Sequence, residues 1–228
     1  MKTLAIESAA KTASVALLED GVLRAELFQN NGLTHSKTVL PMVDSLLSGL
    51  GMTPQEIDRI AVSHGPGSFT GLRIGVAAAK GLALALDIPC VGVSTLEAAA
   101  MNAQDGFICV VMDARAGQVY NACFTMEHGT LSRVTEDRAL PLSELRELLF
   151  SQNRILLLGD GAQLCAAEFQ DHSGLILPPL SMRVPRAFGV GMAAEHYPAV
   201  DPAELKVEYL RVPQAERERL ARMKQKED

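Results

Sequence analysis

A glycine-rich turn between an apolar run and a helix of small residues constrains the fold of this chain most. The apolar run at 60–62 predicts a buried strand, residues 72–86 predict a helix, and residues 64–75 read HGPGSFTGLRIG. Glycines permit backbone geometry that a Cβ resists, and Ser68 or Thr70 can cap the helix. The segment therefore predicts a strand, a tight turn and a helix, as in an α/β protein.

Two interpretations of this turn are open. A helix start leaves backbone N–H groups unpaired, and a phosphate could accept hydrogen bonds from them. The standard phosphate loop, however, requires Lys where Leu72 stands, and the third glycine of G-x-G-x-x-G comes one residue late. The other interpretation is a tight turn that lets the helix pack closely on the strand.

Hydrophobic spacing and turn residues predict two successive halves with similar element order. In the first half we expect strands at 2–7, 12–18, 22–30, 60–62 and 91–93, and helices at 36–50, 53–56 and 72–86. In the second we expect strands at 107–114, 119–126, after Gly129 and at 155–158, and helices at 143–150, 162–169 and 188–196. Residues 171–182 are predicted to be irregular.

The composition favours a sizeable core and argues against a broad nucleic-acid-binding face. Of the 228 residues 48% are hydrophobic, and the formal net charge is −6. An acidic chain is poorly suited to grip RNA or DNA alone. The four cysteines are widely spaced and form no C-x-x-C pair, which is typical of buried thiols in a reducing compartment.

The sequence predicts neither a leader nor a membrane anchor. The apolar start is too short for the core of a signal peptide, and Glu7 interrupts it. The most apolar helical segment, 74–86, carries Lys80 and is shorter than the roughly 20 residues that span a bilayer. These features predict a cytoplasmic protein without membrane contact.

Several segments are together similar to the TsaB (YeaZ) family, which belongs to the bacterial pathway for threonylcarbamoyladenosine in tRNA. They cover most of the chain: LAIES at 4–8, ASVAL at 13–17, HS at 35–36, LP at 40–41, GPGSFTGLRIG at 65–75, AAAKGLA at 77–83, PCVGVSTLE at 89–97, DAR at 113–115, VY at 119–120, LGDG at 158–161 and YLR at 209–211. One departure is Glu7, where family members more often carry Asp.

The resemblance implies an α/β fold of the actin-like ATPase superfamily (ASKHA), with two tandem βββαβαβα halves of which the second is less regular. We expect the first half at 1–103 and the second at 104–182. The remainder, 183–228, should contain a helix and a charged tail and pack back on the first half. The tail from Pro213 alternates Glu with Arg and Lys, so it is either a solvated end or a partner-binding segment.

The resemblance also separates this chain from TsaD, the catalytic relative. TsaD-like chains carry a metal-binding H-x-x-x-H after the strand that matches 91–93, and Thr95 and Ala99 stand at those two positions here. A methyl group cannot ligate a metal, and a neutral hydroxyl does so poorly. We therefore expect no metal site, no catalytic residue and a non-catalytic accessory subunit.

Two helices are expected to form a docking surface, because the resemblance implies that they contact TsaD or, in its absence, a second copy of the chain. Small residues at four-residue spacing let another helix approach closely, and a helix that is apolar all round is buried on more than one side. The alternative is packing on the chain's own sheet. The expected interface residues are Val39, Val43, Leu46, Leu47, Gly71, Leu72, Gly75, Val76, Ala79 and Ala83.

A nucleotide site is a further expectation, with ATP or ADP held at a shared interface and not tightly by this chain alone. Actin-like proteins place phosphates against two hairpin turns and adenosine against a glycine-containing turn. The matching positions, with the start of the glycine turn, are Glu7, Gly67, Ser68, Asp113, Arg115, Gly159 and Gly161. Asp113 and Arg115 could equally pair with each other. His64, at the mouth of the turn, is either a general base or a strand-end residue.

The resemblance thus implies a subunit that supports TsaD in transferring threonylcarbamoyl to N6 of adenosine 37, in tRNAs that read codons beginning with A. A TsaE-like ATPase would join the assembly, tRNA would be contacted through the complex, and the chain alone would form a homodimer. Two alternatives stay open. One is a self-sufficient actin-like ATPase or kinase; the other is a metallopeptidase-like protein, which the missing ligand spacing disfavours.

Overall fold

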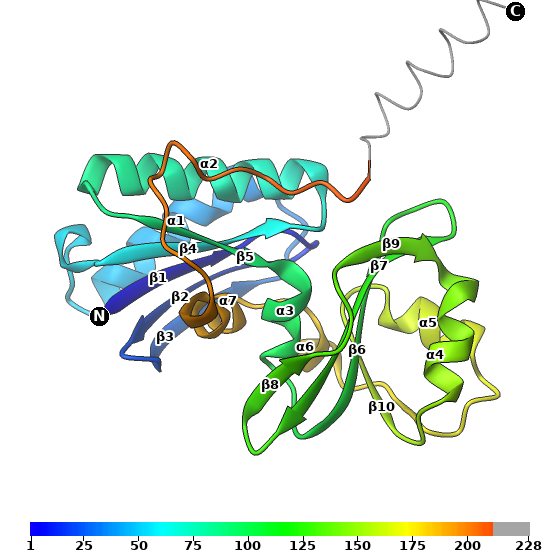
Figure 1. Cartoon of the computed structure of the whole chain (residues 1–228). Coiled ribbons are helices and arrows are strands. Elements are labelled where there is room, and N and C mark those ends of the chain that lie inside the picture. The colour runs from blue at the N-terminus through cyan, green and yellow to red at the C-terminus, as the bar shows by residue number, and fades with distance from the viewer. Residues whose placement is uncertain (212–228) are drawn as a thin grey trace, which may run out of the picture.

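Two mixed β-sheets with flanking helices form two lobes that lie side by side (Figure 1). The computed structural model describes residues 1–211. The strands of the first lobe are β1 (Lys2–Glu7), β2 (Ala13–Glu19), β3 (Val22–Gln29), β4 (Arg59–Gly65) and β5 (Cys90–Ser94). Its helices are α1 (His35–Gly49), η1 (Pro54–Glu56), α2 (Phe69–Leu86) and α3 (Thr95–Ala100).

The second lobe begins at Gly106, and the chain then returns to the first. Its strands are β6 (Gly106–Asp113), β7 (Gln118–Glu127), β8 (Thr130–Arg133), β9 (Arg138–Pro141), β10 (Ile155–Leu158) and β11 (Leu175–Ile176). Its helices are η2 (Leu142–Leu145), α4 (Arg146–Phe150), α5 (Ala162–Glu168) and α6 (Leu180–Arg183). The returning segment contains α7 (Ala187–Ala193) and η3 (Ala194–His196), followed by an extended stretch to 211.

Both sheets have the same strand order. The first runs β3-β2-β1-β4-β5 and the second β8-β7-β6-β10-β11. In each, the first three strands pair antiparallel and the last two join in parallel. The extra strand β9 pairs with β7, and β11 is very short, so the second lobe is the less regular one. The predicted tandem α/β halves are confirmed.

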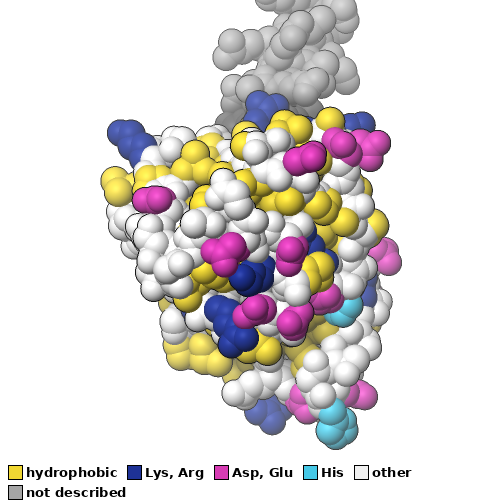
Figure 2. Space-filling model, turned by 90° about the vertical axis from the view of Figure 1, so that its left-hand side faces the viewer, with side chains coloured by type: hydrophobic (Ala, Val, Ile, Leu, Met, Phe, Trp, Pro, Cys, Tyr) yellow, Lys and Arg dark blue, Asp and Glu magenta, His cyan; other side chains and the backbone are white. Residues whose placement is uncertain are grey.

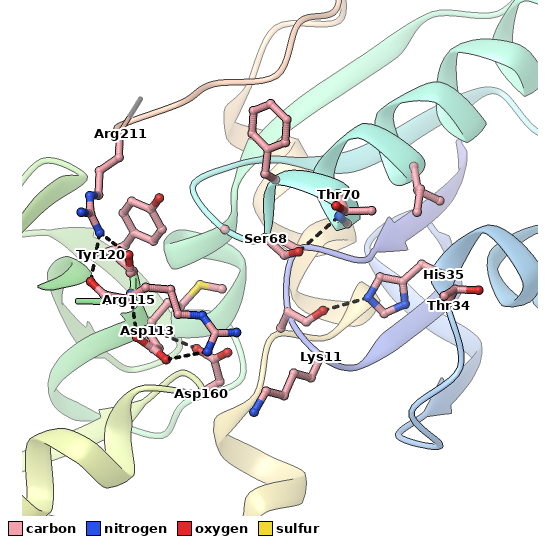
Figure 3. A pocket seen from close by; sticks show the side chains of 18 of the residues that line it. Lys11, Thr34, His35, Ser68, Thr70, Asp113, Arg115, Tyr120, Asp160 and Arg211 are labelled. Atoms are coloured by element: carbon pink, nitrogen blue, oxygen red, sulfur yellow. Dashed lines mark hydrogen bonds and ion pairs between the residues drawn. The ribbon is translucent and has the colours of Figure 1, made fainter. Parts of the chain in front are cut away.

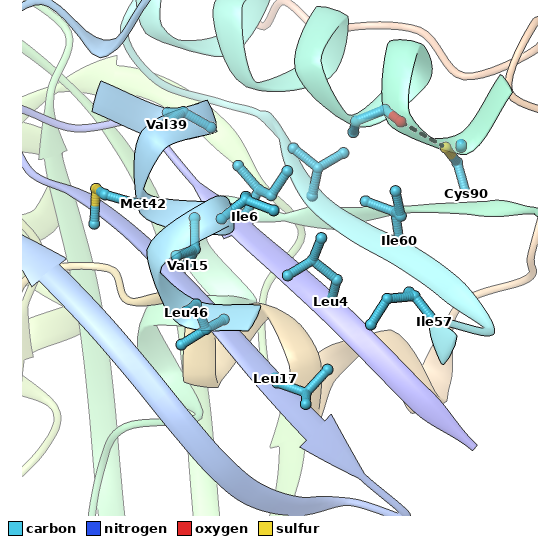
Figure 4. Packing of buried hydrophobic residues seen from close by; sticks show 14 of the residues in the cluster. Leu4, Ile6, Val15, Leu17, Val39, Met42, Leu46, Ile57, Ile60 and Cys90 are labelled. Atoms are coloured by element: carbon cyan, nitrogen blue, oxygen red, sulfur yellow. Dashed lines mark hydrogen bonds between the residues drawn. The ribbon is translucent and has the colours of Figure 1, made fainter. Parts of the chain in front are cut away.

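The first sheet is covered on both faces. Alternation along β1 sends Leu4 and Ile6 toward α1 and α2, where they pack in one apolar cluster (Figure 4), and sends Ala5 to the opposite face. There α7 packs on a floor that includes Ala5, Ala16 and Ala61. Small side chains on this face of the sheet let α7 approach closely. The approach is so close that a Cβ at Gly191 of α7 would overlap the side chain of Leu18.

Local signals placed several turns correctly. Asp20 and Gly21 both have positive φ in the β2–β3 hairpin, which is the geometry that Asp-Gly favours. Thr53 and Glu56 form the predicted capping box. Ser68 is the N-cap of α2, and its hydroxyl accepts from the backbone N–H of Gly71.

Three predictions about the elements need correction. The helix after the glycine turn begins at Phe69, earlier than predicted, because the cap is Ser68. Residues 95–100 form α3, which stands where the expected βββαβαβα order ends in a helix but for which no bounds were predicted. The segment 171–182 was predicted to be irregular but contains β11 and the start of α6. The charged tail, 213–228, lies outside the described residues.

Candidate docking face and interlobe cavity

The glycines of the signature turn make room for the loop that follows β1. A Cβ at Gly67 would overlap the carbonyl oxygen of Ala9, and a Cβ at Gly71 would overlap that of Ser8. At Gly75 it would overlap the hydroxyl of Ser8, which donates a 2.9 Å hydrogen bond to the carbonyl oxygen of Gly71. Gly67, Gly71 and Gly75 therefore serve close packing within the chain, as the second interpretation of the turn predicted.

The residues predicted to dock a partner are buried in the chain's own first lobe. Figure 4 shows that Val39 and Leu46 of α1 point toward strand residues such as Val15. Bulky side chains must cover the sheet, and in both helices they do so from the inner face. The prediction that these residues form a surface is therefore wrong for Val39, Val43, Leu46, Leu47, Gly71, Leu72, Gly75, Val76, Ala79 and Ala83.

The outward side of the same two helices is also apolar. On α2 a stripe of mostly small residues follows the helical repeat, and Leu84 at its edge is 61% exposed. On α1 the neighbouring Leu40 is 50% exposed. Figure 2 shows hydrophobic side chains across the upper part of the molecule, with charged side chains of both signs at its edges and below. We call this surface the outer face; it consists of Leu40, Pro41, Ile74, Ala77, Gly81, Leu84 and Ala85.

One flank of α2 is occupied by the extended segment 198–211, which we call the C-terminal strap (Figure 1). Lys80 donates to the carbonyl oxygens of Ala203 and Leu205, each at 3.1 Å. Arg73 donates to the hydroxyl of Tyr209 at 2.9 Å. The strap thus fixes the two cationic side chains of α2 at the border of the outer face and leaves the face itself apolar.

A cavity of about 620 Å³ lies between the lobes, at the N-terminal ends of α1 and α2 (Figure 3). Its walls come from the first lobe, the second lobe and the strap. The polar and aromatic residues that line it are Lys11, Asn30, Thr34, His35, Ser68, Phe69, Thr70, Asp113, Arg115, Tyr120, Asp160, Tyr209 and Arg211.

The second-lobe wall of the cavity is held by short polar contacts. Asp160 accepts a 3.1 Å hydrogen bond from the backbone N–H of Asp113, and Asp113 accepts one of 2.8 Å from the backbone N–H of Arg115. The pKa of Asp160 is raised, chiefly by burial and also by the carboxylate of Asp113, although the hydrogen bond from the Asp113 N–H and the charges of Lys11 and Arg115 act to lower it. Arg211 of the strap donates to the carbonyl oxygens of Ala114 and Arg115. The strap therefore joins the two lobes above the cavity.

The structure brings together only part of the predicted nucleotide site. Gly67, Ser68, Asp113 and Arg115 line the cavity, and Asp113 also pairs with Arg115 across 3.8 Å. The other predicted contacts, Glu7, Gly159 and Gly161, do not line it. Gly159, at φ +92°, and Gly161 pack against the backbone at the end of β6, where a Cβ would not fit.

Sequence reasoning missed most of the residues that line the cavity, among them Lys11, Tyr120 and Arg211. Lys11 follows β1 in a turn that carried no signal of its own. Tyr120 and Arg211 belong to the segments VY and YLR. Both segments supported the family resemblance, but no function was predicted for either residue. Both face the cavity only because β7 and the strap meet at the junction of the lobes.

Glu7, one of the predicted nucleotide contacts, is fully buried at the end of β1. Its Oε1 accepts a 2.6 Å hydrogen bond from the backbone N–H of Ala9, and its Oε2 accepts from the hydroxyl of Ser63. Burial raises the pKa of Glu7 to about 7, although the two hydrogen bonds act in the opposite direction. The folded chain therefore holds a proton here more tightly than an exposed glutamate does.

We expect this proton to make the protein less stable as the pH rises from about 4.5 to about 7. In that window the folded state binds more protons than the unfolded state, so deprotonation favours unfolding. The loss should be roughly 2–3 kcal/mol and should be absent in Glu7→Gln, whose amide can serve both partners. Urea unfolding at pH 5 and pH 8 measures it; an equal pH dependence in both proteins would contradict the assignment.

His64 does not line the interlobe cavity, and neither do Thr95 and Ala99, which stand where a metal-binding H-x-x-x-H was considered in the sequence. His64 is half-buried near the end of β4, and its Nε2 lies 3.6 Å from the carboxylate of Glu208 in the strap. Burial lowers the pKa of His64, and Glu208 raises it. Thr95 and Ala99 are buried in α3. Among residues 1–211, no three His, Cys, Asp or Glu side chains are grouped so that they could hold a metal ion.

The apolar helix is longer than the sequence predicted, so the argument that it is too short to cross a membrane is wrong. The helix runs from Phe69 to Leu86, and by length and composition alone it could span a bilayer. Its inner face packs on β4 and α1, and Lys80 is bound to the strap. A core helix of a folded lobe meets the same criterion, so this observation is weak support for a membrane span.

Two tandem lobes of identical strand order, with a cavity between them, define a two-lobed α/β protein. YeaZ from Pseudomonas aeruginosa has the same architecture, with a TM-score of 0.75 and 26% identity over 91% of this chain and 99% of that one. A protein of similar fold, described as having similarity to peptidase YeaZ from Pseudomonas aeruginosa, gives a TM-score of 0.78 at 26% identity, over 92% of this chain and 99% of that one.

Sequence comparison identifies the family. The tRNA threonylcarbamoyladenosine biosynthesis protein TsaB of Bacillus subtilis is 36% identical over 95% of this chain and 96% of its own length. The TsaB protein of Escherichia coli is 34% identical over 82% of this chain and 83% of its own. The chain belongs to the TsaB family, as the sequence motifs predicted.

The catalytic relative is recognisable as well. Residues 30–170 match the family model described as TsaD, tRNA N6-adenosine threonylcarbamoyltransferase. The tRNA N6-adenosine threonylcarbamoyltransferase of Nitratidesulfovibrio vulgaris is 34% identical over 113 residues, which is 43% of this chain and 31% of that protein. TsaB and TsaD are thus related chains, and this one resembles TsaB over nearly its whole length.

Proposed function

We propose that this chain is a non-catalytic partner subunit that binds a TsaD-like chain and supports threonylcarbamoyl transfer to N6 of adenosine 37, in tRNAs that read codons beginning with A. The observation that carries this proposal is the similarity to TsaB over nearly the full length of both proteins. A TsaE-like ATPase joins the assembly, tRNA is contacted through the complex, and the complex works in the cytoplasm.

The absence of a catalytic role rests on the positions where TsaD-like chains would hold their metal. Thr95 and Ala99 occupy those positions, and both are buried in α3, where neither can offer a strong ligand. The self-sufficient ATPase and the metallopeptidase are not favoured by the family assignment. Glu7, which an actin-like ATPase would turn toward phosphate, hydrogen-bonds inside the first lobe instead.

The outer face is the surface that we propose for docking. It is apolar, it contains small residues that allow a helix to approach closely, and its borders carry the only cations of α2. The occupant is a TsaD-like chain, because residues 30–170, which include α1 and α2, match the TsaD family model. Two related chains can pair through equivalent helices, and a second copy of this chain takes the same place when TsaD is absent.

We further propose that ATP or ADP binds at the edge of this docking face and not tightly to the chain alone. Ile74 belongs both to the outer face and to the wall of the interlobe cavity. A partner on the outer face would therefore border the cavity. Ser68, at the N-terminus of α2, and Lys11 and Arg115 supply donors and positive charge for phosphate.

Reconstitution tests this function. The purified chain should transfer no threonylcarbamoyl group and hydrolyse ATP negligibly, whereas addition of TsaD, TsaE and the adenylate-forming enzyme should restore modification of tRNA. Modified nucleoside is measured by mass spectrometry of digested tRNA. ATP turnover by the isolated chain that is lost in Asp113→Ala would instead support the self-sufficient ATPase.

A further inference from the structure

A polar cluster links the two lobes through α3. Glu97 accepts hydrogen bonds of 2.8 Å from Nη2 of Arg133 in β8 and of 2.8 Å from the hydroxyl of Tyr197. Nδ1 of His196 lies 3.4 Å from the same carboxylate. Glu97 of the first lobe thus contacts side chains of both the second lobe and the returning C-terminal segment.

Arg133 has a second carboxylate partner. Its Nη1 pairs with Asp137, and the other oxygen of Asp137 accepts from the hydroxyl of Ser94, the N-cap of α3. The guanidinium also lies 4.8 Å from the ring centre of Phe124. Arg133 of the second lobe is therefore bound to Glu97 of the first, and Asp137 of the second lobe to Ser94 of the first.

These side chains are largely withdrawn from water. Those of Glu97, Asp137 and Arg133 are 11%, 17% and 23% exposed. Charges in such surroundings are costly unless their hydrogen bonds are well made, and charge-assisted hydrogen bonds are directional. The apolar contact of α3 with the second lobe, where Leu96 and Ala99 meet Ile108, attracts the lobes but is non-directional. The polar cluster is therefore a part of the junction that favours one orientation, as are the hydrogen bonds of Arg211 to the second lobe at the other side of the cavity.

The junction and the interlobe cavity share a strand. Tyr120 in β7 lines the cavity, and Phe124 further along β7 lies beneath Arg133. The cavity has one wall from each lobe, so a rotation of β7 about α3 changes its width. We propose that Ser94, Glu97, Arg133 and Asp137 form an interlobe latch that fixes the angle between the lobes and thereby the width of the cavity.

The latch is tested by measuring the distance between the lobes. Spin labels are attached to Gln55→Cys and Glu168→Cys, both exposed positions, while the native cysteines are buried. Labelled protein is diluted with unlabelled protein so that each copy is measured alone. Wild type should give one narrow distance distribution. Arg133→Met should broaden or shift it, and Glu97→Gln, which keeps the shape and part of the hydrogen bonding, should do so less.

A matched control separates the latch from general loss of an ion pair. Arg146 pairs with Asp171 inside the second lobe, so Arg146→Met should leave the distribution unchanged. If Arg133→Met is folded by circular dichroism and keeps the wild-type distribution, the cluster only stabilises the junction and the latch is refuted. The result is independent of the proposed function, since the latch lies outside the outer face and the measurement needs no partner.

Discussion

Ala77→Arg is expected to abolish binding to a TsaD-like chain, and dimerisation of the lone chain, while the protein remains folded. Ala77 lies in the middle of the outer face and is exposed, so the substitution strains nothing in the monomer. In a complex the guanidinium would be buried against another helix without a partner. An unpaired buried charge costs several kcal/mol, which corresponds to a loss of affinity of about a hundredfold or more.

Isothermal titration with TsaD and sedimentation of the isolated chain measure the two effects. The matched control is Ala167→Arg, the same change at an exposed alanine of α5 in the second lobe, where we expect no effect. If Ala77→Arg binds TsaD and dimerises like wild type, the docking face lies elsewhere.

Gly71→Ala and Gly81→Ala are expected to change stability in opposite directions, although both add one methyl group to α2. At Gly71 the methyl would overlap the carbonyl oxygen of Ser8, and the backbone must shift. Overpacking of this kind costs about 1–3 kcal/mol. At Gly81 nothing lies within 4 Å of the added Cβ, so the gain in helix propensity, about 0.5–1 kcal/mol, should appear in full.

Urea unfolding of the two variants at one pH decides this prediction, with the sum of the two changes checked in the double variant. A shift in the same direction for both would mean that close approach to the loop after β1 is not the reason for glycine at 71. Gly81→Ala also adds a methyl group to the outer face, so its affinity for TsaD tests how closely the partner helix approaches.

The sequence predicted the fold well because its apolar spacing and turn residues agree. The alternation in β1 and β2, the Asp20-Gly21 hairpin and the Ser68 cap each act within a few residues, and local patterns of that kind are readable. The bounds of α3 were not predicted because no Gly or Pro separates it from β5, and a short buried helix and a buried strand look alike in such a segment.

The docking residues could not be assigned correctly from periodicity alone. Helix α2 is apolar on two sides, and the pattern does not say which side covers the sheet. The side with Val76, Ala79 and Ala83 does so, which leaves the side with Ala77 and Gly81 outward. The glycines at 71 and 75 suggested contact with a partner helix, yet they accommodate a backbone loop of the same chain, which only the tertiary structure reveals.

The residues that line the interlobe cavity could not be predicted from sequence patterns either. Lys11 and Arg211 stand at opposite ends of the chain, and no sequence spacing brings them together. Glu7 matched the family position for a phosphate contact, but its side chain turns to Ser63 of the neighbouring strand. Which way a side chain turns at the end of a strand depends on its neighbours in the sheet, and the sequence does not contain that information in a local form.

The return of the chain from the second lobe to the first has a consequence for biosynthesis. All five strands of the first sheet have been translated by Ser94, but the helix that covers the alanine face of that sheet, α7, begins only at Ala187. Until then the nascent first lobe has an open apolar face while the second lobe is being made. The first lobe is therefore completed last, after the domain that follows it in the sequence.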